Sequence, residues 1–133
     1  MSTETTASVS THILDTSVGR PAEGVAISLA ARSGFDAQWV ALGGSATDAD
    51  GRCKDLPALP EGTTHVRLDF ETEAYFAKNN ANKQAEAQQD APRVRDSGAF
   101  FPEVAITFAV TPGEHYHVPL LLNPFGYSVY RGS

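Results

Sequence analysis

The chemistry that this sequence offers is concentrated in a few histidines. His115 and His117 lie two residues apart in a segment where apolar and polar residues alternate. Side chains two apart on a β-strand leave the same face, so both imidazoles are expected to project together. With a third histidine such as His12, they could form a three-histidine zinc site that keeps one position open for water. Without a metal, one imidazole could act as a general base, because its usual pKa of about 6.5 lies close to neutral pH. Histidines on a sheet face are also often only solvated or packed, and spacing alone leaves all three interpretations open.

One arginine and one cysteine add to the possible chemistry. Arg52 follows Gly51 at the exit of a turn, where its planar guanidinium could donate hydrogen bonds to a carbonyl or to a developing oxyanion. Most arginines at turns have no such role. Cys53 is the single cysteine of the chain and cannot form an internal disulfide. We interpret it as a small residue that is buried or half-buried, rather than as a nucleophile.

Short β-strands are the elements that must position these side chains. The clearest segment of period two is residues 64–71, in which Val66, Leu68 and Phe70 alternate with polar residues. The same alternation predicts strands at residues 9–17, 24–32, 37–42, 102–110, 115–121 and 126–130. Turns are predicted at Gly19-Arg20-Pro21, at Gly43-Gly44 and around Asp50-Gly51.

A change in composition after Glu71 predicts a short helix within residues 71–89, with Tyr75 and Phe76 anchoring its first turn to the core. Residues 79–98 are polar and lack apolar periodicity, which is typical of a surface loop. Seven or eight short strands with one helix, on a chain of 133 residues, predict an all-β sandwich.

Length and composition indicate one compact domain. Of the 133 residues, 41% are hydrophobic and 20% are charged. The formal net charge of -6 argues against partners that require neutralised phosphates, so neither nucleic acid nor a membrane surface is expected. The N-terminal residues do not resemble a signal peptide, and no apolar run approaches the length of a membrane span. We therefore expect a flexible lead-in over residues 1–8, a single domain over residues 9–133 and a cytoplasmic location.

Four blocks of sequence, in order along the chain, carry a resemblance to a known family. They are Thr11–Asp15 with Gly19–Ala22, then Asp50–Arg52, then Phe100–Val104, and finally His115–Leu122 with Pro124–Ser128 and the ending Tyr130-Arg131-Gly132-Ser133. With these blocks, the chain resembles the transthyretin-like 5-hydroxyisourate hydrolases. The ending Tyr-Arg-Gly-Ser is the most specific part of the match.

This resemblance implies a transthyretin-like sandwich of two four-stranded sheets with one short helix. It also implies a homotetramer around a central channel, with active sites where dimers meet. The chain departs from the family in two respects. Residues 78–98 form a polar insert where the hydrolases have a brief loop, and Asn123 and Val129 stand where Ser and Thr are common.

The resemblance also implies site residues and a reaction. The catalytic residues would be His12, Arg52, His117 and Ser133, and the substrate would be bound by His12, Arg52 and Tyr130, whereas His115 is not matched to a catalytic role. The reaction would be hydrolysis of 5-hydroxyisourate to 2-oxo-4-hydroxy-4-carboxy-5-ureidoimidazoline in urate breakdown. His12 or His117 would remove a proton from water while Arg52 stabilises the oxyanion, so neither a cofactor nor a metal is expected.

Two alternatives follow from the same residues. A transthyretin-like carrier would hold a small aromatic ligand in the channel without transforming it. A zinc hydrolase would use His12, His115 and His117 as ligands. Substitution of Arg52 separates the enzyme from the carrier, because a carrier has no hydrolysis to lose, and elemental analysis would detect the zinc.

Overall fold

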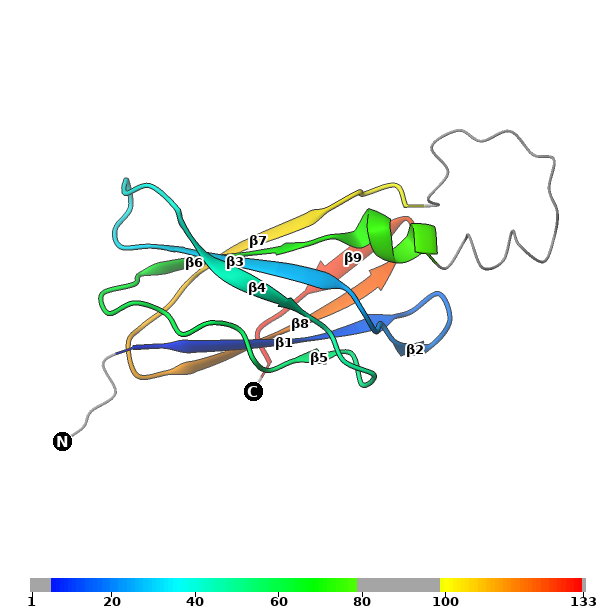
Figure 1. Cartoon of the computed structure of the whole chain (residues 1–133), viewed down its shortest axis with the longest axis horizontal. Helices are drawn as coiled ribbons and strands as arrows, with labels where there is room; N and C mark the ends of the chain where they lie inside the picture. Colours follow the sequence, from blue (N-terminus) through cyan, green and yellow to red (C-terminus); the bar gives the residue numbers. More distant parts are fainter. Residues whose placement is uncertain (1–5, 79–98, 133) are drawn as a thin grey trace, which may run out of the picture.

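Two β-sheets and a short helix make up the part of the chain that the computed structural model describes, residues 6–78 and 99–132. The sheets lie face to face, and the helix lies at one end of the sandwich (Figure 1). In chain order the strands are β1 (Ser8–Asp15), β2 (Arg20–Pro21), β3 (Ala26–Arg32), β4 (Val40–Ala46), β5 (Arg52–Cys53), β6 (His65–Phe70), β7 (Val104–Ala109), β8 (His115–Asn123) and β9 (Gly126–Val129). The described part of the helix covers residues 72–78.

The sheet that carries most of the candidate residues is built around β1 and β8. Its strand order is β2-β1-β8-β9, and β5 also pairs with β1. β1 and β8 run parallel, with Ser10 opposite His117 and His12 opposite Pro119. β5 pairs antiparallel with β1 on its other side, where His12 lies opposite Arg52. Three segments that are distant in the sequence therefore meet along β1.

The second sheet has the order β4-β3-β6-β7, and its neighbouring strands are antiparallel. The predicted all-β sandwich is therefore confirmed, and this sheet has the predicted four strands. The first sheet has five rather than four, because the two-residue strands β2 and β5 both pair with β1. Arg20 and Pro21, predicted to be part of a turn, form β2.

Alternation along the strands gives each sheet a core face and an outer face. In β1, Val9, Thr11 and Ile13 are buried, whereas Ser10 and His12 lie on the outer face and are half-buried. The largest fully buried apolar side chains are Phe70, Ile13, Ile27, Leu29, Leu68, Leu120 and Leu122. Burial of each such side chain contributes about 1.5–3 kcal/mol, and a slip by one residue would turn the buried set outward. The core thus fixes which side chains reach the outer face.

The turn predicted at Gly43-Gly44 is wrong, because both glycines lie inside β4. This strand covers Val40–Ala46 instead of the predicted residues 37–42. A Cβ atom on Gly44 would collide with the carbonyl oxygen of Ile27, and Gly43 has a φ of 136°. The register between β3 and β4 shifts in this region. Glycine here allows an irregular strand and a close backbone approach, rather than a reversal of the chain.

The six other predicted strands each match an observed one, with ends that differ by at most two residues. The predicted anchors of the helix, Tyr75 and Phe76, are buried. Tyr75 Oη donates a hydrogen bond of 2.7 Å to Oδ2 of Asp15, which is buried at the end of β1. Residues 1–5 of the predicted lead-in (residues 1–8) and the predicted polar loop at residues 79–98 lie outside the described residues. Within the rest of the lead-in, Ala7 is buried and Ser8 begins β1. No helix in the described ranges is both long and apolar enough to cross a membrane.

Candidate active site

The parallel pairing of β1 with β8 brings His12 and His117 to one surface. Both side chains lie on the outer face of the first sheet, and both are half-buried. Ser10 lies opposite His117 in the register, so His12 is two positions farther along the same face. His65 belongs to β6 in the second sheet and is not part of this group.

A tight turn before β5 adds Arg52 to this surface. Oδ1 of Asp48 accepts hydrogen bonds from the backbone N–H groups of Asp50 and Arg52, at 2.9 Å and 3.0 Å. These bonds, chiefly the one from Arg52, hold the pKa of the Asp48 carboxyl below its usual value. Gly51 has a φ of 76°, and a Cβ atom there would collide with the carbonyl oxygen of Ile13. A glycine is thus needed for the chain to enter β5 next to His12.

His12 has a fixed tautomer when it is neutral. Its Nε2 lies 3.0 Å from the carbonyl oxygen of Asp50. A carbonyl oxygen can only accept, so Nε2 carries the proton and Nδ1 is the free acceptor. The turn that positions Arg52 therefore also orients His12.

His117 is held as a neutral imidazole. Burial lowers its pKa below the ordinary value of 6.5, and the nearby groups that are or can become cations, His12, Arg52 and His115, lower it further. Its Nδ1 lies 2.9 Å from Oγ of Ser10. At neutral pH the ring can accept a proton, which is what a general base requires.

The C-terminal segment packs directly against His117. The backbone N–H of Gly132 donates a 2.7 Å hydrogen bond to the carbonyl oxygen of His117. A Cβ atom on Gly132 would lie 2.9 Å from Cδ2 of the His117 ring, so only glycine fits without displacing it. Ser133, predicted to be catalytic, lies outside the described residues.

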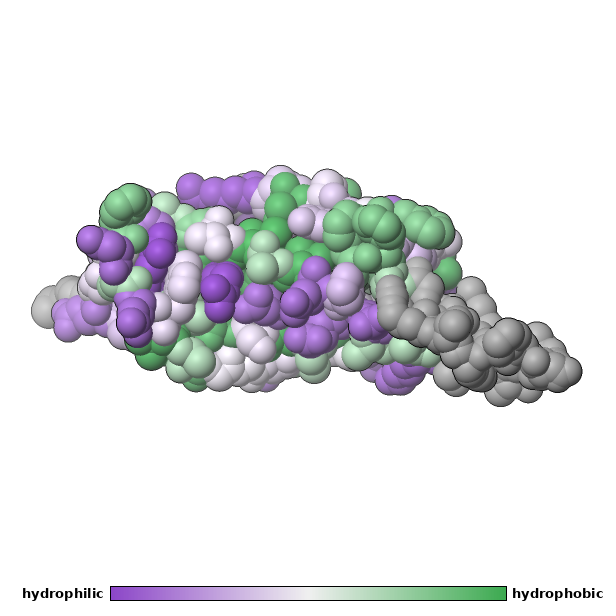
Figure 2. All heavy atoms as spheres, turned by 90° about the horizontal axis from the view of Figure 1, so that it is seen from above, coloured by the Kyte–Doolittle hydropathy of each residue, from purple (hydrophilic) through white to green (hydrophobic). Residues whose placement is uncertain are grey.

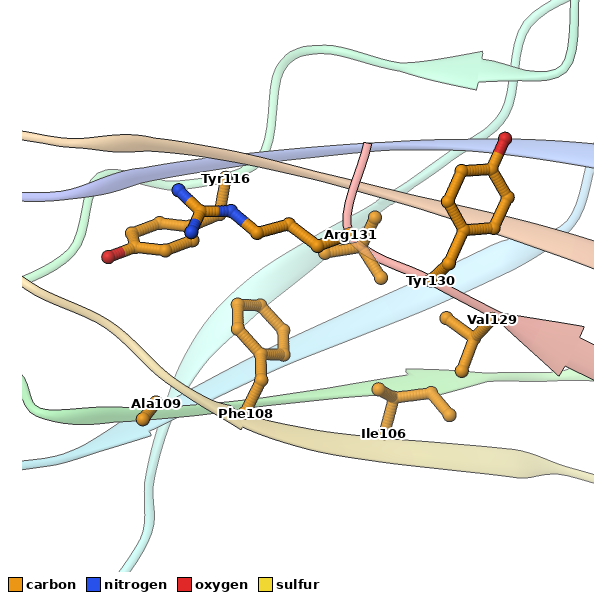
Figure 3. A pocket seen from close by; sticks show the side chains of 8 residues that line it. Ile106, Phe108, Ala109, Tyr116, Val129, Tyr130 and Arg131 are labelled. Atoms are coloured by element: carbon orange, nitrogen blue, oxygen red, sulfur yellow. The ribbon is translucent and has the colours of Figure 1, made fainter. Parts of the chain in front are cut away.

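Tyr130 and Arg131 point to opposite sides of the chain (Figure 3). A cavity of about 230 Å³ opens between the edge strands β7 and β9, and Ile106, Phe108 and Val129 line it. The guanidinium of Arg131 lies 4.5 Å from the ring centre of Tyr116 beside this cavity. The Tyr130 ring points away from the other lining residues, and it is 57% exposed. The cavity lies on the core side of β8, whereas His117 lies on its outer face.

Three of the predicted site residues, His12, Arg52 and His117, are thus brought together. Tyr130 follows β9, and its backbone N–H lies 3.4 Å from the carbonyl oxygen of Pro119 on β8. The sequence interpretation gave no role to Ser10, whose Oγ lies 2.9 Å from a ring nitrogen of both His115 and His117. The available signal was its position two residues before His12, on the same strand face.

The histidines considered for zinc do not form a ligand group. Within residues 6–78 and 99–132, no cluster of three His, Cys, Asp or Glu side chains could hold a metal ion. His115 Nε2 and His117 Nδ1 both contact Ser10, and His12 Nε2 contacts a backbone carbonyl. The arrangement instead combines a neutral imidazole with a guanidinium, which suits general base catalysis with oxyanion stabilisation.

Comparison with known proteins identifies the family. The sequence profile of the HIUase/Transthyretin family matches residues 9–132. The chain belongs to this family. It is 37% identical to the 5-hydroxyisourate hydrolase of Caulobacter vibrioides, over 94% of this chain and 97% of that protein. It is 35% identical to the mouse 5-hydroxyisourate hydrolase, over 94% of each chain. It is also 39% identical to the Arabidopsis thaliana uric acid degradation bifunctional protein TTL, but spans only 37% of that protein's length.

Solved structures of two kinds share the fold. The 5-hydroxyisourate hydrolase of Klebsiella pneumoniae is 35% identical, with a TM-score of 0.66 over 94% of this chain and 98% of that one. Sea bream transthyretin in complex with thyroxine is 26% identical, with a TM-score of 0.72 over 93% of each chain. The expected transthyretin-like sandwich is therefore confirmed. Shape alone does not separate enzyme from carrier, so the distinction rests on the side chains.

Proposed function

We propose that this protein hydrolyses 5-hydroxyisourate to 2-oxo-4-hydroxy-4-carboxy-5-ureidoimidazoline, a step in urate breakdown. The observation that carries the proposal is the group of His12, Arg52 and His117 on one sheet face, assembled from β1, β5 and β8. Relatives named 5-hydroxyisourate hydrolase are aligned over nearly the whole chain and support the substrate class.

His117 acts as the general base in this proposal. Its lowered pKa keeps the ring unprotonated at neutral pH, and its partner Ser10 occupies Nδ1. The free Nε2 takes a proton from water as the water oxygen forms a bond to a ring carbonyl carbon. The ring C–N bond at that carbon then breaks, and the proton passes from Nε2 to the leaving nitrogen. Arg52 donates hydrogen bonds to the oxygen that becomes negative. The base contributes about 10²- to 10⁴-fold in rate, and the donor to the oxyanion about 10²- to 10³-fold.

The remaining predicted residues bind the substrate. His12 presents Nδ1 as an acceptor, because Asp50 holds its Nε2 proton, and it can receive a hydrogen bond from a ring N–H of the substrate. Tyr130 and Ser133 orient the bound ring from the C-terminal segment. Gly132, between them, is bonded to the backbone of His117, so this segment borders the base directly.

The assembly that we propose is a homotetramer with the site at an interface between subunits. Several large apolar side chains on this chain are exposed, among them Phe125 at 79%, Phe100 at 68% and Val18 at 55%. Figure 2 shows hydrophobic residues exposed at both ends and near the centre of the face that it presents. Exposed aromatic groups of this kind are typical of surfaces that associate.

A carrier of small aromatic ligands is the second candidate. The observation that favours it is the close similarity in shape to sea bream transthyretin, which was solved in complex with thyroxine. The two proposals differ in their dependence on Arg52, because a carrier needs no group to stabilise an oxyanion.

The test is the decay of freshly generated 5-hydroxyisourate, followed by ultraviolet absorbance with and without the protein. We expect the protein to accelerate the decay, and Arg52→Gln to lower kcat/KM by about 10²- to 10³-fold. Arg20→Gln is the matched control, because Arg20 is exposed on β2. It lies opposite Asp15 in the strand register, at the other end of β1. An unaccelerated decay, together with binding of an aromatic ligand, would contradict hydrolysis and favour the carrier.

A further inference from the structure

A row of hydrogen bonds runs across the outer face of β1 and β8 and ends at His117. Ser8 Oγ lies 2.6 Å from Nδ1 of His115, and Nε2 of His115 lies 2.9 Å from Oγ of Ser10. The same Ser10 Oγ lies 2.9 Å from Nδ1 of His117. The parallel register causes this alternation, because Ser8 pairs with His115 and Ser10 pairs with His117.

When both rings are neutral, two arrangements of the protons use the hydroxyl proton of Ser10 within the row. The hydroxyl of Ser10 has a single proton and can donate it to one ring only. In the first arrangement, Ser10 donates to His115 Nε2 and accepts from His117 Nδ1, so Nε2 of His117 is left with a lone pair. In the second arrangement every bond is reversed, and Nε2 of His117 carries a proton. Ser10 can also accept from both rings, which again leaves a lone pair on Nε2 of His117. A general base at Nε2 therefore requires that Ser10 accept from Nδ1 of His117, as in the first arrangement.

We propose that Ser10 and His115 are positioning residues that hold His117 in the tautomer with its proton on Nδ1, so that Nε2 is free to accept a proton. This inference rests on the proposed hydrolysis, because the contact distances fit either direction of the hydrogen bonds and the need for a base at Nε2 selects one of them. Catalytic triads use the same principle: one nitrogen of the histidine acts as the base, and a hydrogen bond to the other nitrogen holds the ring in the required tautomer. In the same arrangement Ser8, at the far end, accepts a hydrogen bond from Nδ1 of His115.

Three groups that are or can become cations face His117: His12 from β1, Arg52 from β5 and His115 from β8. Together with the burial of the ring, they oppose a positive charge on His117. Acid removes the base by protonating this ring.

The decisive measurement is the ring ¹⁵N spectrum of the labelled full-length protein without substrate, assigned with His117→Gln. At neutral pH we expect an Nδ1–H, Nε2-unprotonated signature for His117 in the native chain. We expect the same signature in Ser10→Thr, which keeps the hydroxyl, and loss of it in Ser10→Ala. An Nε2–H signature in the native chain, or an unchanged signature in Ser10→Ala, would overturn the proposal.

Kinetics supply the second readout. Ser10→Ala is expected to lower kcat by about tenfold or more with little change in KM, because part of the general base contribution is lost, and Ser10→Thr is expected to restore it. His115→Gln tests the row without altering β1, and it should lower kcat with little change in KM, because the row then lacks the ring that accepts the Ser10 proton. Ser28→Ala is the control, because Ser28 is exposed on β3 of the other sheet. An equal loss of kcat in Ser10→Ala and Ser10→Thr, with both variants folded by circular dichroism, would contradict the positioning role.

The ¹⁵N spectrum needs no substrate. A protein that fails to hydrolyse 5-hydroxyisourate would therefore overturn the proposed function and leave the measured tautomer of His117 standing.

Discussion

His117 stays neutral near pH 7 because of where it lies. Half-burial makes its charged form costly, and three neighbouring groups that are or can become cations add to that cost. An exposed histidine with the same neighbours would lose much of this effect to screening by water. The position of a single ring on β8 thus accounts for its suitability as a base.

Activity should therefore persist into mildly acidic solution. Because the pKa of His117 is lowered, kcat/KM is expected to fall only as the pH drops through a value below 6.5. The unfolded chain takes up this proton at higher pH than the folded one, so stability is also lost as the pH falls below 6.5. A kcat/KM profile and chemical denaturation at several pH values check both statements. A half-maximal kcat/KM above the ordinary histidine value would contradict the assignment of His117 as the base.

Gly132 offers a test of how finely the ring must be placed. Gly132→Ala puts a methyl group 2.9 Å from Cδ2 of His117 and should displace the ring, which lowers kcat/KM by about tenfold to 10²-fold. Gly126→Ala is the matched control, because nothing lies within 4 Å of its Cβ position. Measured kcat/KM and thermal unfolding of both variants separate a displaced base from a damaged fold. Equal activities in the two variants would show that the ring tolerates displacement.

At the scale of elements, alternation of residue types predicted most of the strands, but it could not predict how they pair. β2 and β5 have only two residues each, too few for any period, and so they were missed as strands. Glycine commonly marks turns, which predicts a turn at Gly43 and Gly44, whereas in the structure Gly44 marks a close approach between β3 and β4. The parallel pairing of β1 with β8 leaves no local signal.

Because the sequence pattern does not predict strand pairing, it predicts only part of the candidate site. His115 and His117 share a face by spacing alone, and their common contact with Ser10 confirms this. The meeting of His12, Arg52 and His117 depends on strand pairing, and it was expected from the family resemblance rather than from any period. Ser10 was missed because a serine on a strand resembles any other polar residue until its partner across the sheet is known.

The turn into β5 is the element on which Arg52 depends. Gly51→Ala forces a side chain into left-handed backbone and against the Ile13 carbonyl oxygen, at a cost on the order of 1–3 kcal/mol. Gly19→Ala also places alanine at positive φ, 68°, but nothing lies within 4 Å of its Cβ. We expect Gly19→Ala to lower only stability, and Gly51→Ala to lower stability more and kcat as well, since Arg52 would move. Urea denaturation and kinetics check this, and an equal effect of the two substitutions would contradict it.

At the scale of the whole molecule, the proposed tetramer should depend on exposed aromatic side chains near the site-bearing sheet. Phe125, between β8 and β9, is 79% exposed, so Phe125→Glu should weaken assembly without unfolding the subunit. Phe35, between β3 and β4, is 78% exposed and provides the matched control on the other sheet. Light scattering at micromolar concentration measures the mass of each. A native protein that is monomeric under these conditions would contradict a shared site, and equal masses for the two variants would contradict an interface at Phe125.

The pairing of β1 with β8 has a consequence for how the cell makes this protein. Parallel neighbours cannot be joined by a hairpin, and here the contacting side chains of Ser8 and His115 are 107 positions apart. The ribosome must therefore synthesise residue 117 before this imidazole can contact its neighbours on β1 and β5. Until then, the edge of β1 that pairs with β8 stays unpaired. A nascent fragment that ends before residue 117 contains His12 and Arg52 but not the imidazole of His117, so a truncated product would lack the proposed base however well its remaining strands had formed.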